Sequence, residues 1–144
     1  MNYDDLLVSN MKMILVRGLP GSGKSTIAKN LIGRYSINWH LETDQFWMKD
    51  GQYVFDASRL DEAHKWCQDQ TIDLMNRGFN PVVSNTFTTR KELQPYFDIA
   101  KSFGIVPQVI LCQAQYGNIH NVPEKTLKRM AARFEYDISD MYSM

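Results

Sequence analysis

The feature that most constrains this chain is the eight-residue segment Gly18–Ser25, which reads GLPGSGKS. It satisfies G-x-x-x-x-G-K-[ST], the pattern of a loop that wraps around a phosphate group. An apolar run, Met13–Val16, precedes the segment, and apolar residues at helical spacing follow it in Ile27–Ile32. The pattern alone arises by chance in roughly one of a few hundred chains of this length. Because the segments on both sides also fit a strand and a helix, a chance match is a poor explanation for the motif. The chain is therefore predicted to bind a nucleoside triphosphate.

Each residue type in this loop has a physical role. Glycines allow a tight turn in which consecutive backbone N–H groups point at one anion, and the helix N-terminus adds partial positive charge. Lys24 is expected to reach the β- and γ-phosphates, and the hydroxyl of Ser25 is expected to bind Mg²⁺. The predicted nucleotide-binding residues are Gly18, Leu19, Pro20, Gly21, Ser22, Gly23, Lys24, Ser25 and Thr26.

Length and composition set wider limits. The 144 residues give room for one domain with a hydrophobic core. Sixteen basic residues balance sixteen acidic ones, so any polyanion site must be a local patch. No apolar stretch has the length of a membrane span and no signal peptide opens the chain, so we expect a cytoplasmic protein without a membrane partner. Cys67 and Cys112 lack metal-ligand spacing and are expected to be buried thiols of a reducing compartment.

Strands alternate with helices along the chain, which predicts a parallel sheet with helices on both faces. Strands are expected at about 12–17, 36–41, 81–86 and 106–112. Helices are expected at about 24–34, from Asp56 or Ser58 to Gly78, from Thr88 or Thr89 to about 103, and from Pro123 to about 136. Pro95 should kink or split the third helix. Residues 1–10 are interpreted as a loose N-terminal extension, 11–136 as the domain, and 137–144 as a short frayed tail.

Asp44 follows the second predicted strand and is a candidate general base. In an open α/β sheet the carboxyl end of that strand faces the phosphate loop, where ligands bind. There Asp44 could accept the proton of an acceptor hydroxyl during phosphoryl transfer, although it could also cap a helix. The chain has no N-K-x-D guanine motif and no long hydrophobic strand ending in acidic residues. A small kinase therefore fits the sequence better than a GTPase or a motor ATPase.

Together these motifs resemble the polynucleotide-kinase-like P-loop kinases, a family that includes the kinase half of phage 5′-hydroxyl polynucleotide kinase and AAA_33-type ATP-binding domains. The resemblance covers about residues 12–136 and rests on the phosphate loop and on segments 42–46, 60–66, 83–86 and 118–123. It implies a P-loop kinase-like three-layer α/β sandwich with a four-stranded parallel sheet and a helical lid. It also implies ATP and Mg²⁺ as cofactors, transfer of the γ-phosphate to a hydroxyl, and Asp44 as the general base.

The chain departs from this family at three places. Trp47 stands where the phage enzyme has an arginine for the acceptor, and Asn85 stands where it has an aspartate that could support Mg²⁺. Tyr116-Gly117 replaces the arginine that usually precedes the lid, a position worth about 10³–10⁵ in rate. One of Arg129 and Arg133, with Arg129 preferred, is therefore expected to approach the phosphates; alternatively both lie on a solvated helix face.

The resulting prediction is an ATP-dependent phosphotransferase, and the family resemblance points to the 5′-hydroxyl of a single-stranded nucleic acid or nucleotide as acceptor. Two alternatives remain open: an ATP-binding interaction module without phosphotransfer, and a small-molecule kinase. Trp47, Tyr53 and Phe55 could stack an acceptor base, but a partly buried hairpin would have the same composition and is favoured.

Overall fold

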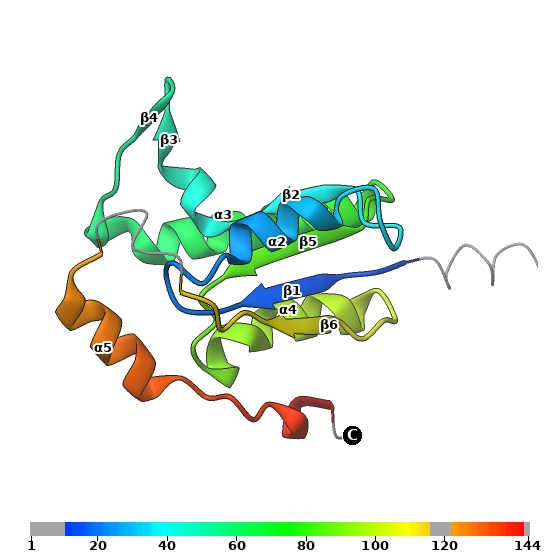
Figure 1. Cartoon of the computed structure of the whole chain (residues 1–144). Helices are drawn as coiled ribbons and strands as arrows, with labels where there is room; N and C mark the ends of the chain where they lie inside the picture. Colours follow the sequence, from blue (N-terminus) through cyan, green and yellow to red (C-terminus); the bar gives the residue numbers. More distant parts are fainter. Residues whose placement is uncertain (1–10, 116–121, 143–144) are drawn as a thin grey trace, which may run out of the picture.

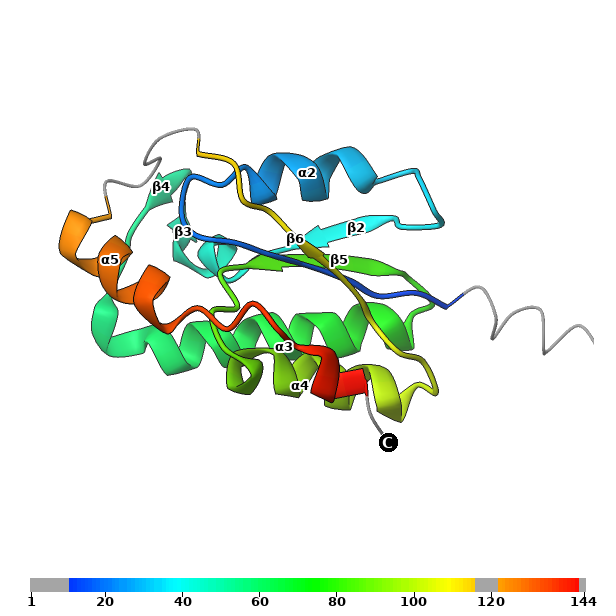
Figure 2. The same ribbon diagram turned by 60° about the horizontal axis from the view of Figure 1, so that its bottom comes forward.

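The computed structural model describes residues 11–115 and 122–142. Its main sheet has four parallel strands, β1 (Ile14–Arg17), β2 (Trp39–Leu41), β5 (Pro81–Asn85) and β6 (Gln108–Leu111), in the order β2-β5-β1-β6. Helix α2 (Lys24–Leu31) covers one face, and helices α3 (Leu60–Asn76) and α4 (Arg90–Ser102) cover the other (Figures 1 and 2). The last helix, α5 (Glu124–Arg133), lies beyond the carboxyl ends of the strands (Figure 1). The predicted three-layer α/β sandwich is confirmed.

Strand β1 is buried on both faces because its side chains alternate between two cores. Leu15, with Met13 just before the strand, belongs to the larger core, which α3 and α4 complete. Ile14 and Val16 belong to a smaller core that includes Ala28 of α2. The four side chains Met13–Val16 are at most 3% exposed. A continuous apolar run of this kind is what a central parallel strand requires.

Between β2 and α3 the chain forms a short 3-10 helix, η1 (Thr43–Trp47), and a two-stranded hairpin, β3 (Met48–Lys49) with β4 (Gln52–Tyr53). Asp50 and Gly51 close the hairpin with φ of 51° and 78°, the positive values that a type I′ turn needs. The hairpin projects from the body of the molecule (Figure 1). The predicted hairpin is confirmed.

Backbone geometry corrects the predicted bounds of several elements. Helix α2 ends at Leu31 rather than near 34, and Gly33 adopts a φ of 82°. The second strand begins at Trp39 rather than 36, because Tyr35 and Ser36 have positive φ angles that a strand cannot contain. Helix α5 ends at Arg133 rather than at 136, since Phe134 is extended.

Helix α4 begins after the predicted cap Thr89, whereas α3 begins at Leu60, later than the predicted Asp56 or Ser58. Thr89 caps α4 through a reciprocal pair of hydrogen bonds with Glu92, the capping-box arrangement. Asp56 accepts a hydrogen bond from the Ser58 backbone and begins a 3-10 helix, η2 (Ala57–Arg59), that leads into α3. Pro95 does not split α4, which runs unbroken from Arg90 to Ser102.

The C-terminal residues fold back onto the body. They form a 3-10 helix, η3 (Ser139–Tyr142), in which the Tyr142 hydroxyl donates to the Pro107 carbonyl at 3.0 Å. The Tyr142 ring also packs edge-on against Phe97, with centroids 5.3 Å apart. The expectation of a frayed tail is therefore wrong for residues 139–142, whereas the predicted extension at 1–10 lies outside the described residues. No helix within the described ranges combines the length and apolarity needed to cross a bilayer.

Candidate active site

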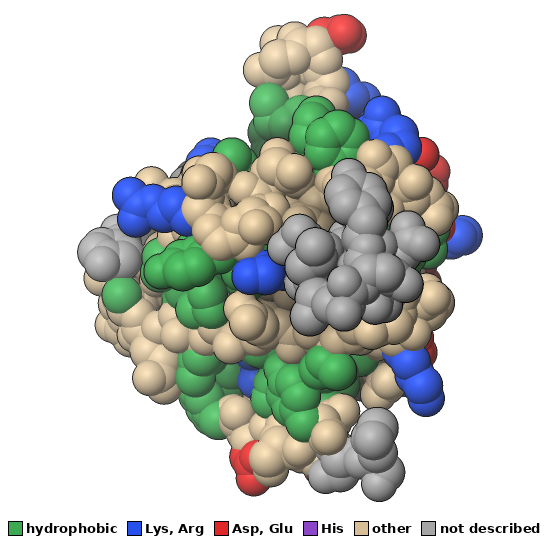
Figure 3. Space-filling model, turned by 90° about the vertical axis from the view of Figure 1, so that its right-hand side faces the viewer, with side chains coloured by type: hydrophobic (Ala, Val, Ile, Leu, Met, Phe, Trp, Pro, Cys, Tyr) green, Lys and Arg blue, Asp and Glu red, His purple; other side chains and the backbone are tan. Residues whose placement is uncertain are grey.

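The carboxyl ends of the four strands bring the predicted site residues to one edge of the sheet. Strand β1 leads into the phosphate loop, β2 into Glu42–Asp44, and β5 ends at Asn85. Ligands bind at this edge in open α/β sheets. The face that Figure 3 displays, at the opposite end of the strands, shows scattered Lys, Arg, Asp and Glu side chains among separate groups of hydrophobic ones. The carboxyl edge is therefore the candidate site.

The shape of the phosphate loop depends on its glycines. Gly21 and Gly23 have φ angles of 82° and 86°, which side chains rarely tolerate. A side chain at Gly18 would collide with the Ser22 hydroxyl and would lie 2.7 Å from the Cys112 carbonyl oxygen. The loop is closed by a hydrogen bond from the Ser22 backbone to the Leu19 carbonyl, 3.1 Å long. The predicted tight turn is thus present.

Two observations fit this loop to a phosphate. Helix α2 begins at Lys24 without a side-chain cap, and its first turn holds no acidic residue, so no side chain offsets the partial positive charge of its N-terminus. The Ser22 hydroxyl is buried and has no hydrogen-bond partner within the described residues. Buried polar groups normally have partners, and a helix N-terminus binds anions. The residues present therefore fit a phosphate group.

Lys24 provides the cation of the site. Burial lowers the pKa of its ammonium group, and the negative charges of Asp44 and then Glu42 oppose that shift most strongly. Within the part of the chain that the structure describes, Lys24 forms no ion pair, so its charge is not already committed to a carboxylate. Lys24 and Asp44, predicted as site residues from distant segments, are brought together.

A hydrogen-bonded cluster joins α2 to β2 and β5. The hydroxyl of Ser25 donates to Glu42 Oε2 at 2.7 Å, and the hydroxyl of Ser84 donates to the same oxygen at 3.1 Å. His40 Nε2 lies 2.7 Å from Ser84 Oγ and 3.6 Å from Glu42 Oε2. Burial lowers the pKa of His40, which favours the neutral ring. The hydroxyl predicted to bind Mg²⁺ is thus in direct contact with a carboxylate.

Asp44 lies in the first turn of η1, where a carboxylate is favourable, but it is not the N-cap; that position belongs to Glu42, whose side chain makes no cap hydrogen bond. The Tyr53 hydroxyl, from the hairpin, donates to Asp44 Oδ1 at 3.4 Å. Burial and the charge of Asp44 raise the pKa of Tyr53 to about 12, so the phenol stays protonated. Asp44 is half-buried and is therefore accessible to an acceptor.

Two of the departures from the family have structural roles here. Asn85 Oδ1 accepts a hydrogen bond from the Thr43 backbone at 2.8 Å, and its amide nitrogen lies 3.9 Å from Cys67 Sγ. Asn85 thereby fixes the backbone next to Asp44. Trp47 is only 1% exposed and packs edge-on against Phe46 and Phe55. The alternative in which Trp47 stacks an acceptor base is therefore wrong, whereas Tyr53 and Phe55 remain exposed.

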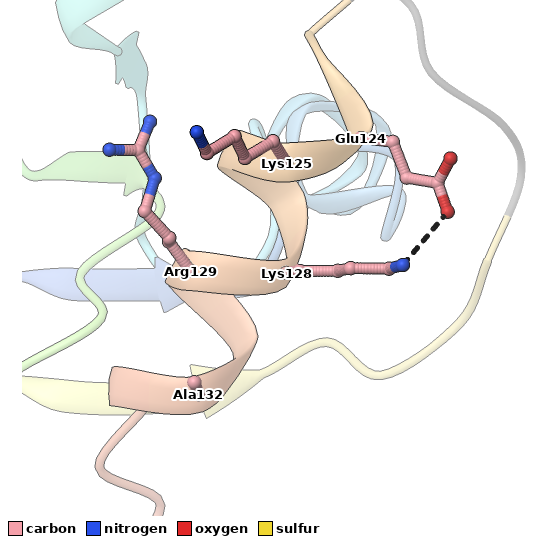
Figure 4. Close-up of a pocket in the computed structure, with 5 residues that line it drawn as sticks. All are labelled: Glu124, Lys125, Lys128, Arg129 and Ala132. Carbon is pink, nitrogen blue, oxygen red and sulfur yellow. Dashed lines mark ion pairs between the residues drawn. The ribbon is translucent and has the colours of Figure 1, made fainter.

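The two arginines of α5 have different surroundings. Arg133 Nε donates to Thr88 Oγ1 at 3.1 Å, which holds the end of the helix against the loop between β5 and α4. Arg129 is exposed and donates to Thr126 of its own helix at 3.3 Å, the one hydrogen bond of its side chain within the described residues. A pocket of about 490 Å³ runs along α5, and Figure 4 shows Lys125 and Arg129 on the same side of the helix. Tyr116-Gly117, the third departure, lies outside the described residues.

Two site residues were not singled out from the sequence. Glu42 directly follows the second predicted strand, and an acidic residue two positions before a candidate base was the available signal. Arg17 is 1% exposed at the end of β1, where Nε and Nη2 donate to the Phe87 carbonyl at 3.0 and 2.7 Å. A basic residue closing an apolar strand was the available signal, because a buried guanidinium needs partners.

Comparisons of the sequence place the chain among known proteins. A family model described as an AAA domain (AAA_33) matches residues 13–136. NEDD4-binding protein 2 from Homo sapiens is 28% identical over 141 residues, which cover 88% of this chain and 8% of that protein. Uncharacterized protein PM0531 from Pasteurella multocida is 29% identical over 131 residues, which cover 82% of this chain and 73% of that protein. The chain thus spans only a small part of the human relative.

Solved structures share the fold. A chain of the Pnkp1/Rnl/Hen1 complex has a TM-score of 0.59 at 21% identity, covering 83% of this chain and 38% of that one. A sugar kinase from Janibacter sp. has a TM-score of 0.63 at 14% identity, with coverages of 90% and 81%. The APS kinase CysC of Mycobacterium tuberculosis has a TM-score of 0.55 at 18% identity, with coverages of 83% and 67%. With a P-loop kinase-like fold and a family match over most of its length, the chain belongs to the AAA_33 family of AAA domains.

Proposed function

We propose that this chain is an ATP-dependent phosphotransferase that moves the γ-phosphate of ATP to a hydroxyl, with the 5′-hydroxyl of a polynucleotide or nucleotide as the acceptor. The observation that carries the proposal is that Lys24 and Asp44 lie at the same carboxyl edge of the sheet, where Asp44 is the carboxylate whose charge acts most strongly on the lysine. One group suits the transferred phosphate and the other suits the attacking hydroxyl.

The proposed reaction assigns each residue one task. Backbone N–H groups of the phosphate loop and the Lys24 ammonium bind the β- and γ-phosphates and offset their charge. Asp44 takes the proton of the acceptor hydroxyl as its oxygen bonds to the γ-phosphorus. The bond between that phosphorus and the β,γ-bridging oxygen breaks, and ADP leaves with the electron pair. Arg129 is proposed to approach the phosphates during transfer.

The Ser25 hydroxyl is the proposed protein ligand of Mg²⁺. When bound with ATP, the ion supplies charge neutralisation on the β- and γ-phosphate oxygens. Ser25 is the second residue of α2, so its hydroxyl lies next to the loop that holds the phosphates. No group of three or more His, Cys, Asp or Glu side chains within the described ranges is arranged to hold a metal by itself. That fits an ion bound mainly through substrate phosphates, as is usual for Mg²⁺.

The acceptor side of the site is proposed to include the hairpin. Tyr53 and Phe55 are 39% and 53% exposed, and Tyr53 touches Asp44. Aromatic rings beside the general base are suited to stacking a nucleobase. One of the structural relatives is a chain of the Pnkp1/Rnl/Hen1 RNA repair complex, which supports a polynucleotide acceptor for this chain.

Two other functions are supported by particular observations. The sugar kinase and the APS kinase share the fold, which supports a small-molecule acceptor as an alternative. The Asn85 amide, which stands in place of an aspartate, contacts the Thr43 backbone and Cys67 Sγ. One relative is named for binding another protein. Together these observations support an ATP-binding module without phosphotransfer. Both cysteines are free and buried, which supports the proposal of a reducing, cytoplasmic setting.

An acceptor panel with ATP labelled at the γ-phosphate tests these proposals. The panel contains 5′-hydroxyl DNA and RNA oligonucleotides, 3′-nucleotides, sugars and adenosine phosphosulfate. Label on a 5′-hydroxyl end is expected. Label found only on a small molecule would show that the acceptor is a small molecule and not a polynucleotide. ATP binding without transfer to any acceptor would favour the ATP-binding module.

A further inference from the structure

We propose that Glu42 is the carboxylate of the magnesium site, acting beside Ser25 on the ion that accompanies the nucleotide. This inference rests on the proposed function, because it requires the phosphate loop to bind a nucleotide with Mg²⁺. It assigns a role to a residue at the carboxyl end of β2, two positions before Asp44, and gives the two acidic side chains separate tasks.

Glu42 is in direct contact with the hydroxyl of the phosphate loop. Glu42 Oε2 accepts from the Ser25 hydroxyl at 2.7 Å, and Ser25 is the loop residue whose oxygen type and position suit Mg²⁺. The Glu42 side chain is 21% exposed, so a ligand can still reach it. Mg²⁺ binds to proteins through one or two carboxylates together with substrate phosphates and waters. Ser25 and Glu42 together meet that requirement.

The acidic residue near the phosphate loop comes from β2 and not from β5. In nucleotide-binding proteins with this loop, an acidic residue at a strand end supports the metal along with the loop hydroxyl. Here β5, the strand beside β1, ends in Ser84 and Asn85, which are not acidic. The Asn85 amide is already used on the Thr43 backbone, at 2.8 Å. Strand β2 pairs with β5 on the side away from β1, and Glu42 follows β2 directly. The negative charge near the loop therefore comes from the strand beyond β5.

Hydrogen bonds from neighbouring residues hold the Glu42 side chain in place. Ser84 donates to Glu42 Oε2 at 3.1 Å, and His40 Nε2 lies 2.7 Å from Ser84 Oγ. Because the Ser84 proton points to Glu42, the His40 Nε2–H donates to Ser84. Residues behind a metal ligand fix its orientation, and their arrangement here holds one carboxylate oxygen toward α2. Ser84 and His40 are therefore positioning residues for Glu42.

The test compares the parent chain with Glu42→Gln, which keeps an oxygen that can accept from Ser25 but removes the charge. Affinity for a non-hydrolysable ATP analogue is measured by calorimetry in EDTA and over a Mg²⁺ series. The gain in affinity on adding Mg²⁺ is expected to fall about 10- to 100-fold in the variant, with the EDTA value nearly unchanged. Mn²⁺ binding, followed by its electron paramagnetic resonance signal with the analogue present, should weaken in parallel. Glu62→Gln, the same change at an exposed glutamate of α3, is the matched control.

A relocation variant provides a second test that does not depend on Glu42→Gln folding well. Glu42→Ser combined with Ser84→Asp moves the carboxylate to the neighbouring strand, to the position whose hydroxyl contacts Glu42 Oε2 in the parent. It is expected to regain most of the Mg²⁺-dependent gain that Glu42→Ser alone loses. A relocation variant that binds the analogue in EDTA but gains nothing from Mg²⁺ would overturn the inference.

The outcomes separate this inference from the proposed function. A parent chain that binds no nucleotide, with or without Mg²⁺, overturns both. A parent that gains affinity from Mg²⁺ and a Glu42→Gln variant that gains equally overturn only the role of Glu42. In that case the carboxylate merely orients Ser25, which glutamine can do as well.

Discussion

Asp44 and Glu42 are two residues apart in the chain, but their side chains have different neighbours. Glu42 accepts from the hydroxyls of Ser25 and Ser84, whereas Asp44 is contacted by the hydroxyl of Tyr53. A carboxylate in contact with the loop hydroxyl suits metal binding, and one beside an exposed aromatic surface suits an acceptor. The separation of these two environments is the residue-scale basis of the proposed chemistry.

Changing Asp44→Asn should abolish transfer while leaving ATP affinity within a few-fold of the parent. The amide keeps the shape of the side chain but cannot take a proton, and general-base catalysis contributes about 10²–10⁴ in rate. Single-turnover transfer and calorimetry with an ATP analogue measure the two quantities. Asp50→Asn makes the same change at the exposed hairpin turn, where asparagine tolerates the φ of 51°, and should leave both unchanged. Transfer that survives Asp44→Asn would exclude Asp44 as the base.

Changing Lys24→Ala should weaken nucleotide binding and lower turnover together. Hydrogen bonds to charged groups contribute about 1.5–3 kcal/mol, so the loss of affinity should be about 10- to 100-fold. Lys29→Ala removes a lysine from the exposed part of the same helix and serves as the control. Binding is measured by calorimetry, and turnover by ADP release. Equal affinity in the parent and Lys24→Ala would show that phosphates do not bind at this loop.

At the scale of elements, local pattern accounts for most of the fold. The apolar run Met13–Val16 and the loop after it specify β1 and α2, and the capping box of Thr89 and Glu92 specifies the start of α4. The bounds near Tyr35 and Ser36 could not be predicted, because positive φ at these residues depends on how the chain turns between α2 and β2.

The parts of the site that escaped prediction depend on contacts between distant segments. Glu42 reaches Ser25 only because β5 lies between β2 and β1, an order that periodicity does not specify. Arg17 donates to Phe87, 70 positions away, so no local pattern could reveal its partner. Asp44 and Lys24 could be predicted as neighbours, since both follow parallel strands and the carboxyl ends of such strands share one edge.

The two arginines of α5 are expected to have different roles, Arg129 in phosphoryl transfer and Arg133 in holding the helix to the core. Arg129→Ala is expected to lower the maximal rate of transfer far more than ATP affinity, because its interaction would strengthen as charge develops. The melting temperature of the Arg129→Ala variant should not change, since the hydrogen bond that Arg129 makes among the described residues stays within its own helix. Arg133→Ala removes the bond to Thr88 and should cost about 1 kcal/mol of stability.

The two variants are each other's controls, with the transfer rate and the melting temperature measured on both. A rate within a few-fold of the parent for both would make α5 a structural helix. The chemistry would then rest on Lys24, Ser25 and Asp44.

At the scale of the whole molecule, the C-terminal segment links α5 to the core. The Phe134 ring lies 4.4 Å from the Arg17 guanidinium, the Glu135 backbone donates to Thr88, and Arg90 pairs with Glu135 at 2.8 Å. These contacts gather around the end of β1, directly before the phosphate loop. The position of α5 is therefore coupled to the strand that carries the nucleotide site.

The Arg17→Lys variant tests this coupling. Lysine keeps the charge but has neither the planar fork that donates twice to the Phe87 carbonyl nor the flat face that stacks on Phe134. Loss of these charge-assisted hydrogen bonds in a buried site should lower the free energy of unfolding by about 1.5–3 kcal/mol in urea denaturation. Arg77→Lys, an exposed arginine stacked on Phe79, is the matched control and should change stability little. Hydrogen exchange should accelerate in residues 124–142 more than in β5, because Arg17 holds that segment to the core. Uniform acceleration across the protein would instead mean that Arg17 stabilises the fold without coupling α5 to the phosphate loop.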